Sequence, residues 1–166
     1  MVKTIALIDG NNFYAACEQS IDPSLIGRPV IVLSNNDGCV IARNPEARAL
    51  GIQMGLPYFK IRKQLEQKSV VVRSSNYALY GDISQRLMKL LQSHCEKLEV
   101  YSIDEAFAYI HRPLNGDLHP WARQLRVTIY QSLGISIAIG LGLSKGQAKL
   151  ANHLAKTQPD YAEICD

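Results

Sequence analysis

Three acidic residues interrupt apolar segments of this 166-residue chain. Asp9 directly follows an apolar run, and Asp104 and Glu105 lie between the runs Tyr101–Ile103 and Ala106–Ala108. An apolar strand normally excludes carboxylates, because a buried charge is costly unless it is paired or binds a metal. A carboxylate cluster that holds two divalent ions about 3.5–4 Å apart is the usual apparatus of phosphoryl or nucleotidyl transfer. The three acids therefore predict a divalent metal site.

Each acid also has a purely structural interpretation. Asp9 alone fits a helix N-cap or a turn residue, and Asp104 with Glu105 fits a solvated hairpin turn. Neighbours in a regular strand point to opposite faces, so Asp104 and Glu105 can share a metal site only if the chain bends between them. The break between the two apolar runs offers such a bend.

Basic and aromatic residues elsewhere could bind a polyanion opposite these acids. Arg43 and Arg48 flank the start of a short helix, and the planar fork of Arg can bond two phosphate oxygens at once. The last predicted helix carries four basic residues on one face: Lys145, Lys149, His153 and Lys156. Solvated helix faces would explain the same residues. Tyr14 either places its ring at the mouth of the site or packs in the core.

The composition indicates a globular protein with a slight positive charge. Hydrophobic residues make up 47% and charged residues 20% of the chain, and the net charge of +3 permits a polyanionic partner. The four cysteines show no Cys-x-x-Cys spacing, and we expect Cys17 and Cys39 to be buried thiols. We find no signal peptide and no transmembrane stretch, so we expect a cytoplasmic protein without a membrane partner.

Apolar periodicity and turn residues predict an alternation of strands and helices. Besides the two apolar runs around Asp104, strands are expected at residues 4–8, 29–33, 39–42, 70–72 and 135–140. Helices are expected at residues 11–20, 45–50, 59–67, 76–91, 120–133 and 146–156. The Asn-Asp-Gly sequence at 36–38 predicts a hairpin turn.

The order of these elements predicts an α+β fold. Residues 1–10 and 77–166 follow the split β-α-β pattern of a ferredoxin-like sheet. Residues 11–76 form an inserted small α/β lobe between its first strand and its first helix. In that topology the first strand can lie beside the hairpin of Asp104 and Glu105, so Asp9 would meet them at one edge of the sheet.

Six segments in this order resemble the Y-family (translesion) DNA polymerases, and within them the UmuC-like branch. They are DGNNFYAACE (9–18), VIVLSNNDGCVIARN (30–44), EARALG (46–51), SSNY (74–77), YSIDEAF (101–107) and AKLANH (148–153). Together they cover essentially the whole chain.

The resemblance implies a palm (1–10 and 77–166) that carries a fingers lobe (11–76). It implies two Mg²⁺ ions, for which Mn²⁺ can substitute, held by the catalytic acids Asp9, Asp104 and Glu105 and the backbone carbonyl of Gly10. Tyr14 would be the steric gate under the sugar of the incoming nucleotide. Arg48 and Lys149 would bind its triphosphate.

The function implied is template-directed nucleotidyl transfer, as the core of an error-prone polymerase in DNA repair and the SOS response. The implied partners are primer–template DNA, a deoxynucleoside triphosphate and accessory repair proteins. The thumb and little-finger domains of the family are absent from the sequence, so we expect weak DNA binding. Two alternatives remain: a non-catalytic palm–fingers remnant or regulatory module, and a cyclase-like enzyme, against which the inserted lobe and Tyr14 argue.

Overall fold

The chain forms two compact units in a computed structural model that describes residues 3–112 and 116–166. The first unit combines the N-terminal segment up to Asn11 with the residues from Gly81 onward, and the second comprises Asn12–Tyr80. The boundary between Tyr80 and Gly81 falls inside a helix. The predicted boundary between the two lobes, at residues 76 and 77, lies at the start of that helix. Each unit has its own sheet.

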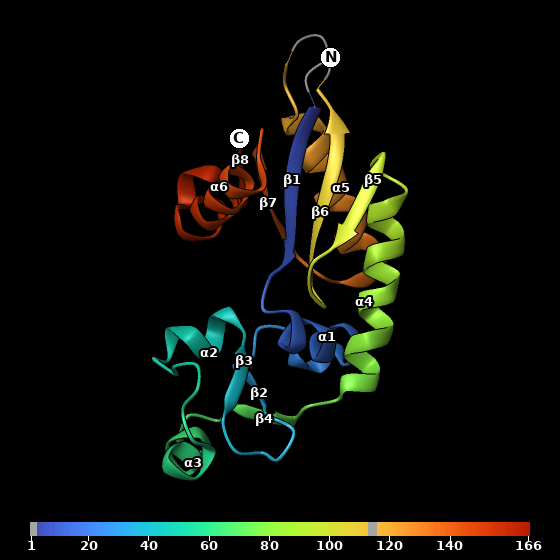
Figure 1. Cartoon of the computed structure of the whole chain (residues 1–166). Coiled ribbons are helices and arrows are strands. Elements are labelled where there is room, and N and C mark those ends of the chain that lie inside the picture. Colours follow the sequence, from blue (N-terminus) through green and yellow to red (C-terminus); the bar gives the residue numbers. More distant parts are fainter. Residues whose placement is uncertain (1–2, 113–115) are drawn as a thin grey trace. The chain divides into compact units, whose positions relative to one another are not determined.

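The sheet of the first unit has five strands in the order β5-β6-β1-β7-β8 (Figure 1). Central strand β1 is antiparallel to both β6 and β7, and β8 is parallel to β7. The first four of these strands have the order of a ferredoxin-like sheet, so the predicted α+β class is confirmed. The strands are β1 (Lys3–Gly10), β5 (Lys97–Val100), β6 (Glu105–His111), β7 (Ile137–Gly142) and β8 (Ile164–Cys165).

Three helices accompany this sheet: α4 (Tyr77–Gln92), α5 (His119–Leu133) and α6 (Lys145–Thr157), followed by the short η2 (Pro159–Tyr161). The expected apolar stripe of α4 is buried at Leu87 and Leu91. Helix α5 ends at Gly134, whose φ of 69° is the left-handed conformation that glycine adopts most readily. Helix α6 covers β7 and β1, and its Ala148 packs with Leu7 and Phe107.

The second unit is built on a three-stranded sheet in the order β3-β2-β4. Strand β2 (Val30–Leu33) pairs antiparallel with β3 (Val40–Arg43) and parallel with β4 (Val71–Ser74). All four residues of β2 are buried, which explains its unbroken apolar sequence. The helices are α1 (Phe13–Ile21), η1 (Pro23–Leu25), α2 (Pro45–Ala49) and α3 (Tyr58–Gln67).

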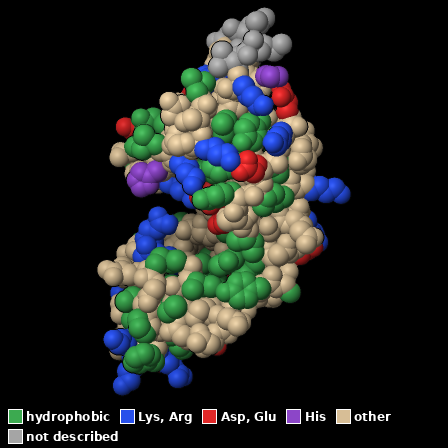
Figure 2. Space-filling view, viewed as in Figure 1, with side chains coloured by type: hydrophobic (Ala, Val, Ile, Leu, Met, Phe, Trp, Pro, Cys, Tyr) green, Lys and Arg blue, Asp and Glu red, His purple; other side chains and the backbone are tan. Residues whose placement is uncertain are grey.

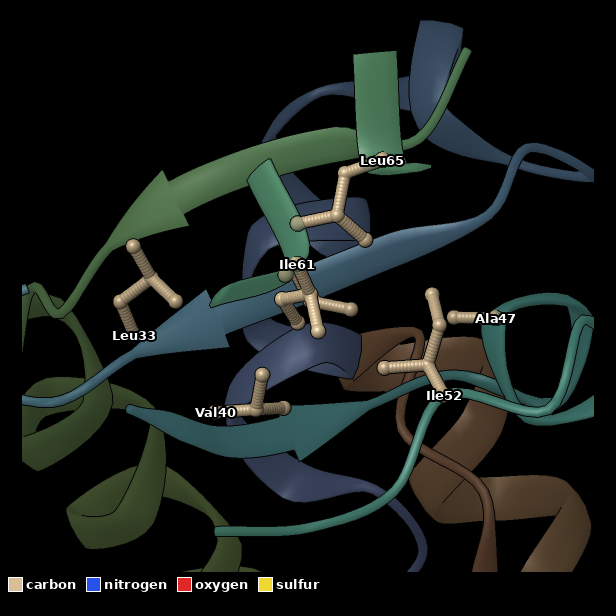
Figure 3. Close-up of a cluster of buried hydrophobic side chains, with 7 residues drawn as sticks. Leu33, Val40, Ala47, Ile52, Ile61 and Leu65 are labelled. Carbon is tan, nitrogen blue, oxygen red and sulfur yellow. The ribbon is translucent and has the colours of Figure 1, made fainter. Parts of the chain in front are cut away.

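One apolar cluster joins the strands of this unit to α2 and α3 (Figure 3). It contains Ile31, Leu33, Val40, Ala47, Ile52, Ile61 and Leu65. The Oδ1 atom of Asn44 caps α2 by accepting from the Ala47 amide at 3.0 Å, with Pro45 in the first turn. The predicted turn between β2 and β3 is present, with Asp37 at a φ of 52°.

Two expectations about the strands are wrong. Tyr101–Ile103 is not a strand, because the amides of Tyr101 and Ser102 both donate to the Glu105 carbonyl and close a tight turn. The preceding strand is β5, and Tyr101 is 55% exposed. Strand β7 begins at Ile137, two residues later than expected.

Cys17 is buried as expected, whereas Cys39 is only half-buried. In the part of the chain that the structure describes, no helix has both the length and the apolar character needed to cross a membrane.

Candidate active site

Asp9 and Glu105 lie opposite each other on adjacent strands. The antiparallel register of β1 and β6 pairs Asp9 with Glu105 and, two residues further along, Leu7 with Phe107. Because side chains alternate between faces, both acids lie on the sheet face that carries Leu7 and Phe107, which is the face that α6 covers. Asp9 is therefore not the N-cap of α1, a position that Asn12 occupies.

The carboxyl group of Asp9 is buried and electrostatically strained. Burial, with only 8% of the residue exposed, raises the pKa of Asp9 to about 6. The ammonium of Lys156 opposes this shift from 2.5 Å, whereas a hydrogen bond with Glu105 and the charge of Glu105 add to it. Burial and the neighbouring Glu105 therefore favour the protonated form of Asp9, and Lys156 favours its carboxylate.

Asp104 reaches the same region from the turn that precedes β6. The Ser102 hydroxyl donates to Asp104 Oδ1 at 2.8 Å and accepts from the Glu105 amide at 3.1 Å. Burial raises the pKa of Asp104, the charge of Asp9 raises it further, and the Ser102 hydrogen bond lowers it. The expected bend is therefore present, and it allows consecutive acids to serve one site. Nothing in the sequence singled out Ser102.

The backbone after Asp9 is tied to the same turn. The amide of Gly10 donates to the Asp104 carbonyl at 2.9 Å, and the Asn11 amide donates to the Ser136 carbonyl at 2.8 Å. The end of β1 is thus held between the turn of Asp104 and the start of β7.

Helix α6 brings its lysines to the site because it lies unusually close to the sheet. Asn152, a buried polar residue, donates to the carbonyls of Leu7 and Ala138 at 3.3 and 3.1 Å. Gly140 permits the approach, since a Cβ atom there would lie 2.1 Å from the Asn152 amide nitrogen. Asn152 lies in the segment AKLANH, but a buried amide is not distinguishable in sequence from an exposed one.

Three lysines of α6 each contact a different group of the first unit. Lys156 pairs with Asp9, and Lys145 pairs with Glu99 at 2.5 Å. Lys149 Nζ lies 4.3 Å from the centre of the Tyr101 ring and donates to its hydroxyl at 3.0 Å. The predicted basic face of α6 therefore exists, but its charges are largely engaged.

Tyr14 and Arg48 belong to the second unit. The Tyr14 ring is half-buried and stacks on Tyr80 at 4.6 Å between ring centres, with Tyr77 edge-on at 5.9 Å. Arg48 donates to the Oδ1 atom of Asn12 at 2.9 Å, and Asn12 adopts a left-handed conformation with a φ of 49°. The structure thus joins Asp9, Asp104 and Glu105 in one unit and holds Tyr14 and Arg48 in the other.

The donor set of the first unit suits a hard divalent cation. Three carboxylates and a backbone carbonyl are the oxygen ligands that Mg²⁺ and Mn²⁺ prefer. In residues 3–112 and 116–166, no three acidic, histidine or cysteine side chains are already arranged around a common metal position. Asp9 forms a hydrogen bond with Glu105, the Ser102 hydroxyl contacts both Asp104 and Glu105, and Lys156 supplies positive charge at Asp9.

Comparison with known proteins identifies the class to which this fold belongs. The structure superposes on the insertion ternary complex of Dbh DNA polymerase with a TM-score of 0.78 and 29% identity, over 89% of this chain and 44% of that one. The fold is that of the Y-family DNA polymerases, as the resemblance implied.

The sequence matches the model of the impB/mucB/samB family over residues 8–153, and the chain belongs to that family. It is 48% identical to the protein UmuC of Salmonella typhimurium over 91% of this chain and 36% of that protein. It is 36% identical to DNA polymerase IV of Picrophilus torridus, over 92% of this chain and 45% of the polymerase. The chain thus spans less than half the length of these relatives.

Proposed function

We propose that the chain is the catalytic core of a DNA polymerase that adds nucleotides opposite a template strand in translesion synthesis. The observation that carries this proposal is the strand register that sets Asp9 opposite Glu105, beside the turn of Asp104. The relatives named UmuC and DNA polymerase IV support it. We assign the palm to residues 1–10 and 77–166 and the fingers to 11–76.

The metal ligands in this proposal are Asp9, Asp104, Glu105 and the backbone carbonyl of Gly10. They would hold two Mg²⁺ ions, with Mn²⁺ as a substitute. Bound there, the ions would lower the pKa of the primer 3′-hydroxyl and neutralise the phosphates of the nucleotide.

Lys156 prepares Asp9 for this role. A carboxyl must be ionised to bind a metal, and burial works against ionisation at Asp9. The ammonium at 2.5 Å favours the carboxylate and so keeps a ligand available in the metal-free protein. Because Lys156 and a divalent ion compete for the same oxygen, Lys156 moves away from Asp9 when the ion binds.

The remaining roles concern the incoming nucleotide. Tyr14 packs under the sugar and collides with a 2′-hydroxyl, and its stacking on Tyr80 holds the ring in place. Arg48 and Lys149 bind the triphosphate, since both are basic side chains at exposed positions. Primer–template DNA and a deoxynucleoside triphosphate are the substrates, and accessory repair proteins are partners. The setting is cytoplasmic DNA repair within the SOS response.

Thermal unfolding with Mg²⁺ and a deoxynucleoside triphosphate tests the metal assignment. Ligand that binds only the folded state raises the melting temperature, so we expect a shift in the wild type. Asp104→Ala and Glu105→Gln should lose it, whereas Asp82→Asn, on the exposed side of α4, should keep it. Absence of a shift in the wild type, or an unchanged shift in Asp104→Ala, would refute the assignment. A normal shift without primer extension would favour the non-catalytic alternative.

A further inference from the structure

All of the chain's excess positive charge lies on helix α3 and the residue after it. The segment 58–68 holds four of the 18 Lys and Arg residues but only one of the 15 Asp and Glu residues. The rest of the chain therefore has as many acidic as basic side chains. In Figure 2, Lys and Arg side chains gather at the lower left, where α3 lies.

An exposed aromatic ring lies among these charges. Phe59 is 78% exposed, the largest fraction among the exposed large hydrophobic residues that the structure describes. Arg62 and Lys63 follow it by three and four residues and so share its face of the helix. The ammonium of Lys60 lies 5.9 Å from the centre of its ring.

The charges of this patch differ in availability. Arg62 pairs with Glu66 at 3.0 Å, and Lys68 donates to the Leu50 carbonyl. Lys60 and Lys63 are exposed and form no ion pair with any residue that the structure describes. On α6, by contrast, Lys145 and Lys156 are paired with carboxylates.

We propose that Phe59, Lys60 and Lys63 form a binding surface for single-stranded nucleic acid, outside the active site. Nonspecific single-strand binding combines aromatic rings, on which unpaired bases stack, with cations along the phosphate backbone. Duplex bases are already stacked, so the exposed ring favours a single strand. A membrane surface fits less well, because the apolar side of α3, with Ile61 and Leu65, is buried in the core. The surface deepens the proposed function, since it would contact the unpaired template, but it needs neither metal nor nucleotide.

Fluorescence anisotropy with a labelled single-stranded oligonucleotide, in EDTA and at low salt, tests this surface on the whole chain. The double variant with Lys60→Gln and Lys63→Gln should bind at least about threefold more weakly. The slope of log K against log salt concentration should become less negative by about 1.4, because each lost phosphate contact contributes roughly 0.7. The matched control Lys89→Gln with Lys97→Gln removes the same charge from exposed positions of the first unit and should change neither quantity to this extent.

The aromatic contact has its own pair of variants. Phe59→Ala should weaken binding by about five- to 150-fold, which corresponds to about 1–3 kcal/mol per stacked base, whereas Phe59→Tyr keeps an aromatic ring and should retain wild-type binding. Tyr130→Ala, which removes an exposed ring from α5, serves as the control. Circular dichroism should show all variants folded, because every mutated side chain is exposed.

Several outcomes would overturn the proposal. One is the absence of binding by the wild type at low salt. Another is binding by the Lys60 and Lys63 double variant that equals binding by the wild type. A third is competition by polyglutamate as strong as competition by the oligonucleotide, together with no effect of Phe59→Ala. The last result would make the patch a docking surface for an acidic protein. Asp104→Ala should bind the oligonucleotide normally, so failure of the active-site proposal would remain distinguishable.

Discussion

Lys156 Nζ lies 2.5 Å from Asp9 Oδ2, so a lysine holds the carboxylate that we assign to a metal ion. This relationship gives Asp9 two states. In the metal-free protein the lysine offsets part of the burial that raises the pKa of Asp9 to about 6. If a divalent ion binds Asp9 as we propose, its stronger charge should displace the lysine.

Replacing Lys156 should therefore separate metal binding from metal-free stability. Lys156→Gln should lower the melting temperature in EDTA, because the buried Asp9 loses its counter-charge. It should also increase the stabilisation by Mg²⁺, because the group that competes with the ion for Asp9 is gone. Differential scanning fluorimetry over a Mg²⁺ titration measures both. Lys145→Gln, on the same helix but paired with Glu99, should leave the Mg²⁺ response unchanged. An equal or smaller Mg²⁺ shift in Lys156→Gln would contradict the competition.

The close approach of α6 to the sheet should make Gly140 irreplaceable. A Cβ atom there would lie 2.1 Å from the Asn152 amide nitrogen and 2.3 Å from the Ala148 carbonyl oxygen. Because both are backbone atoms, a change of side-chain rotamer cannot relieve the clash. We expect Gly140→Ala to destabilise the fold by about 1–3 kcal/mol or more, measured by urea unfolding. Gly81→Ala is the matched control, since its Cβ meets nothing within 4 Å and alanine favours a helix by about 1 kcal/mol. Similar effects of the two substitutions would show that the approach is not tight.

Tyr14 should decide which sugar is accepted. Tyr14→Ala should raise incorporation of ribonucleotides relative to deoxynucleotides, because a rejection set by steric contact disappears with the ring. Single-nucleotide addition with each substrate measures the ratio. Tyr14→Phe keeps the ring that stacks on Tyr80 and should retain the wild-type ratio. An unchanged ratio in Tyr14→Ala would remove the gate role.

The Tyr80–Glu18 hydrogen bond should make the fold sensitive to alkaline pH. Tyr80 is fully buried and donates to Glu18 at 2.7 Å; burial first, and then this bond, raise the pKa of its phenol. When the pKa of a phenol is higher in the folded than in the unfolded protein, the stability that this phenol contributes is fully present below the unfolded-state pKa of about 10. This contribution is lost as the pH rises toward the folded-state pKa. The melting temperature should thus fall more steeply above about pH 10 in the wild type than in Tyr80→Phe. The control Tyr130→Phe, at an exposed position, should show the same dependence of melting temperature on pH as the wild type.

The ferredoxin-like sheet could be predicted because its strands and helices differ in apolar period and are separated by clear turn signals. That topology places β1 beside β6, whereas the register that sets Asp9 opposite Glu105 is seen only in the structure. The error at Tyr101–Ile103 has a local cause: Ser102 and Tyr101 turn the chain by bonding to Glu105, so the apolar Ile103 is not part of a strand.

The contacts that tune the site could not be predicted. Lys156 is separated from Asp9 by most of the chain, and its spacing on α6 only showed that it shares a face with Lys145 and Lys149. Asn152 binds backbone carbonyls, which no side-chain pattern reveals. The palm and fingers boundaries and the roles of the site residues remain predictions.

Template-directed addition of one nucleotide to a labelled primer, with Mg²⁺ at low salt, tests the central claim most directly. We expect the wild-type chain to add the complementary nucleotide and the chain with both Asp104→Ala and Glu105→Ala not to add it. Asp82→Asn should be as active as the wild type. Addition by the double variant at the wild-type rate, or nucleotide binding by the wild type without addition under any condition, would contradict the assignment of these acids to catalysis.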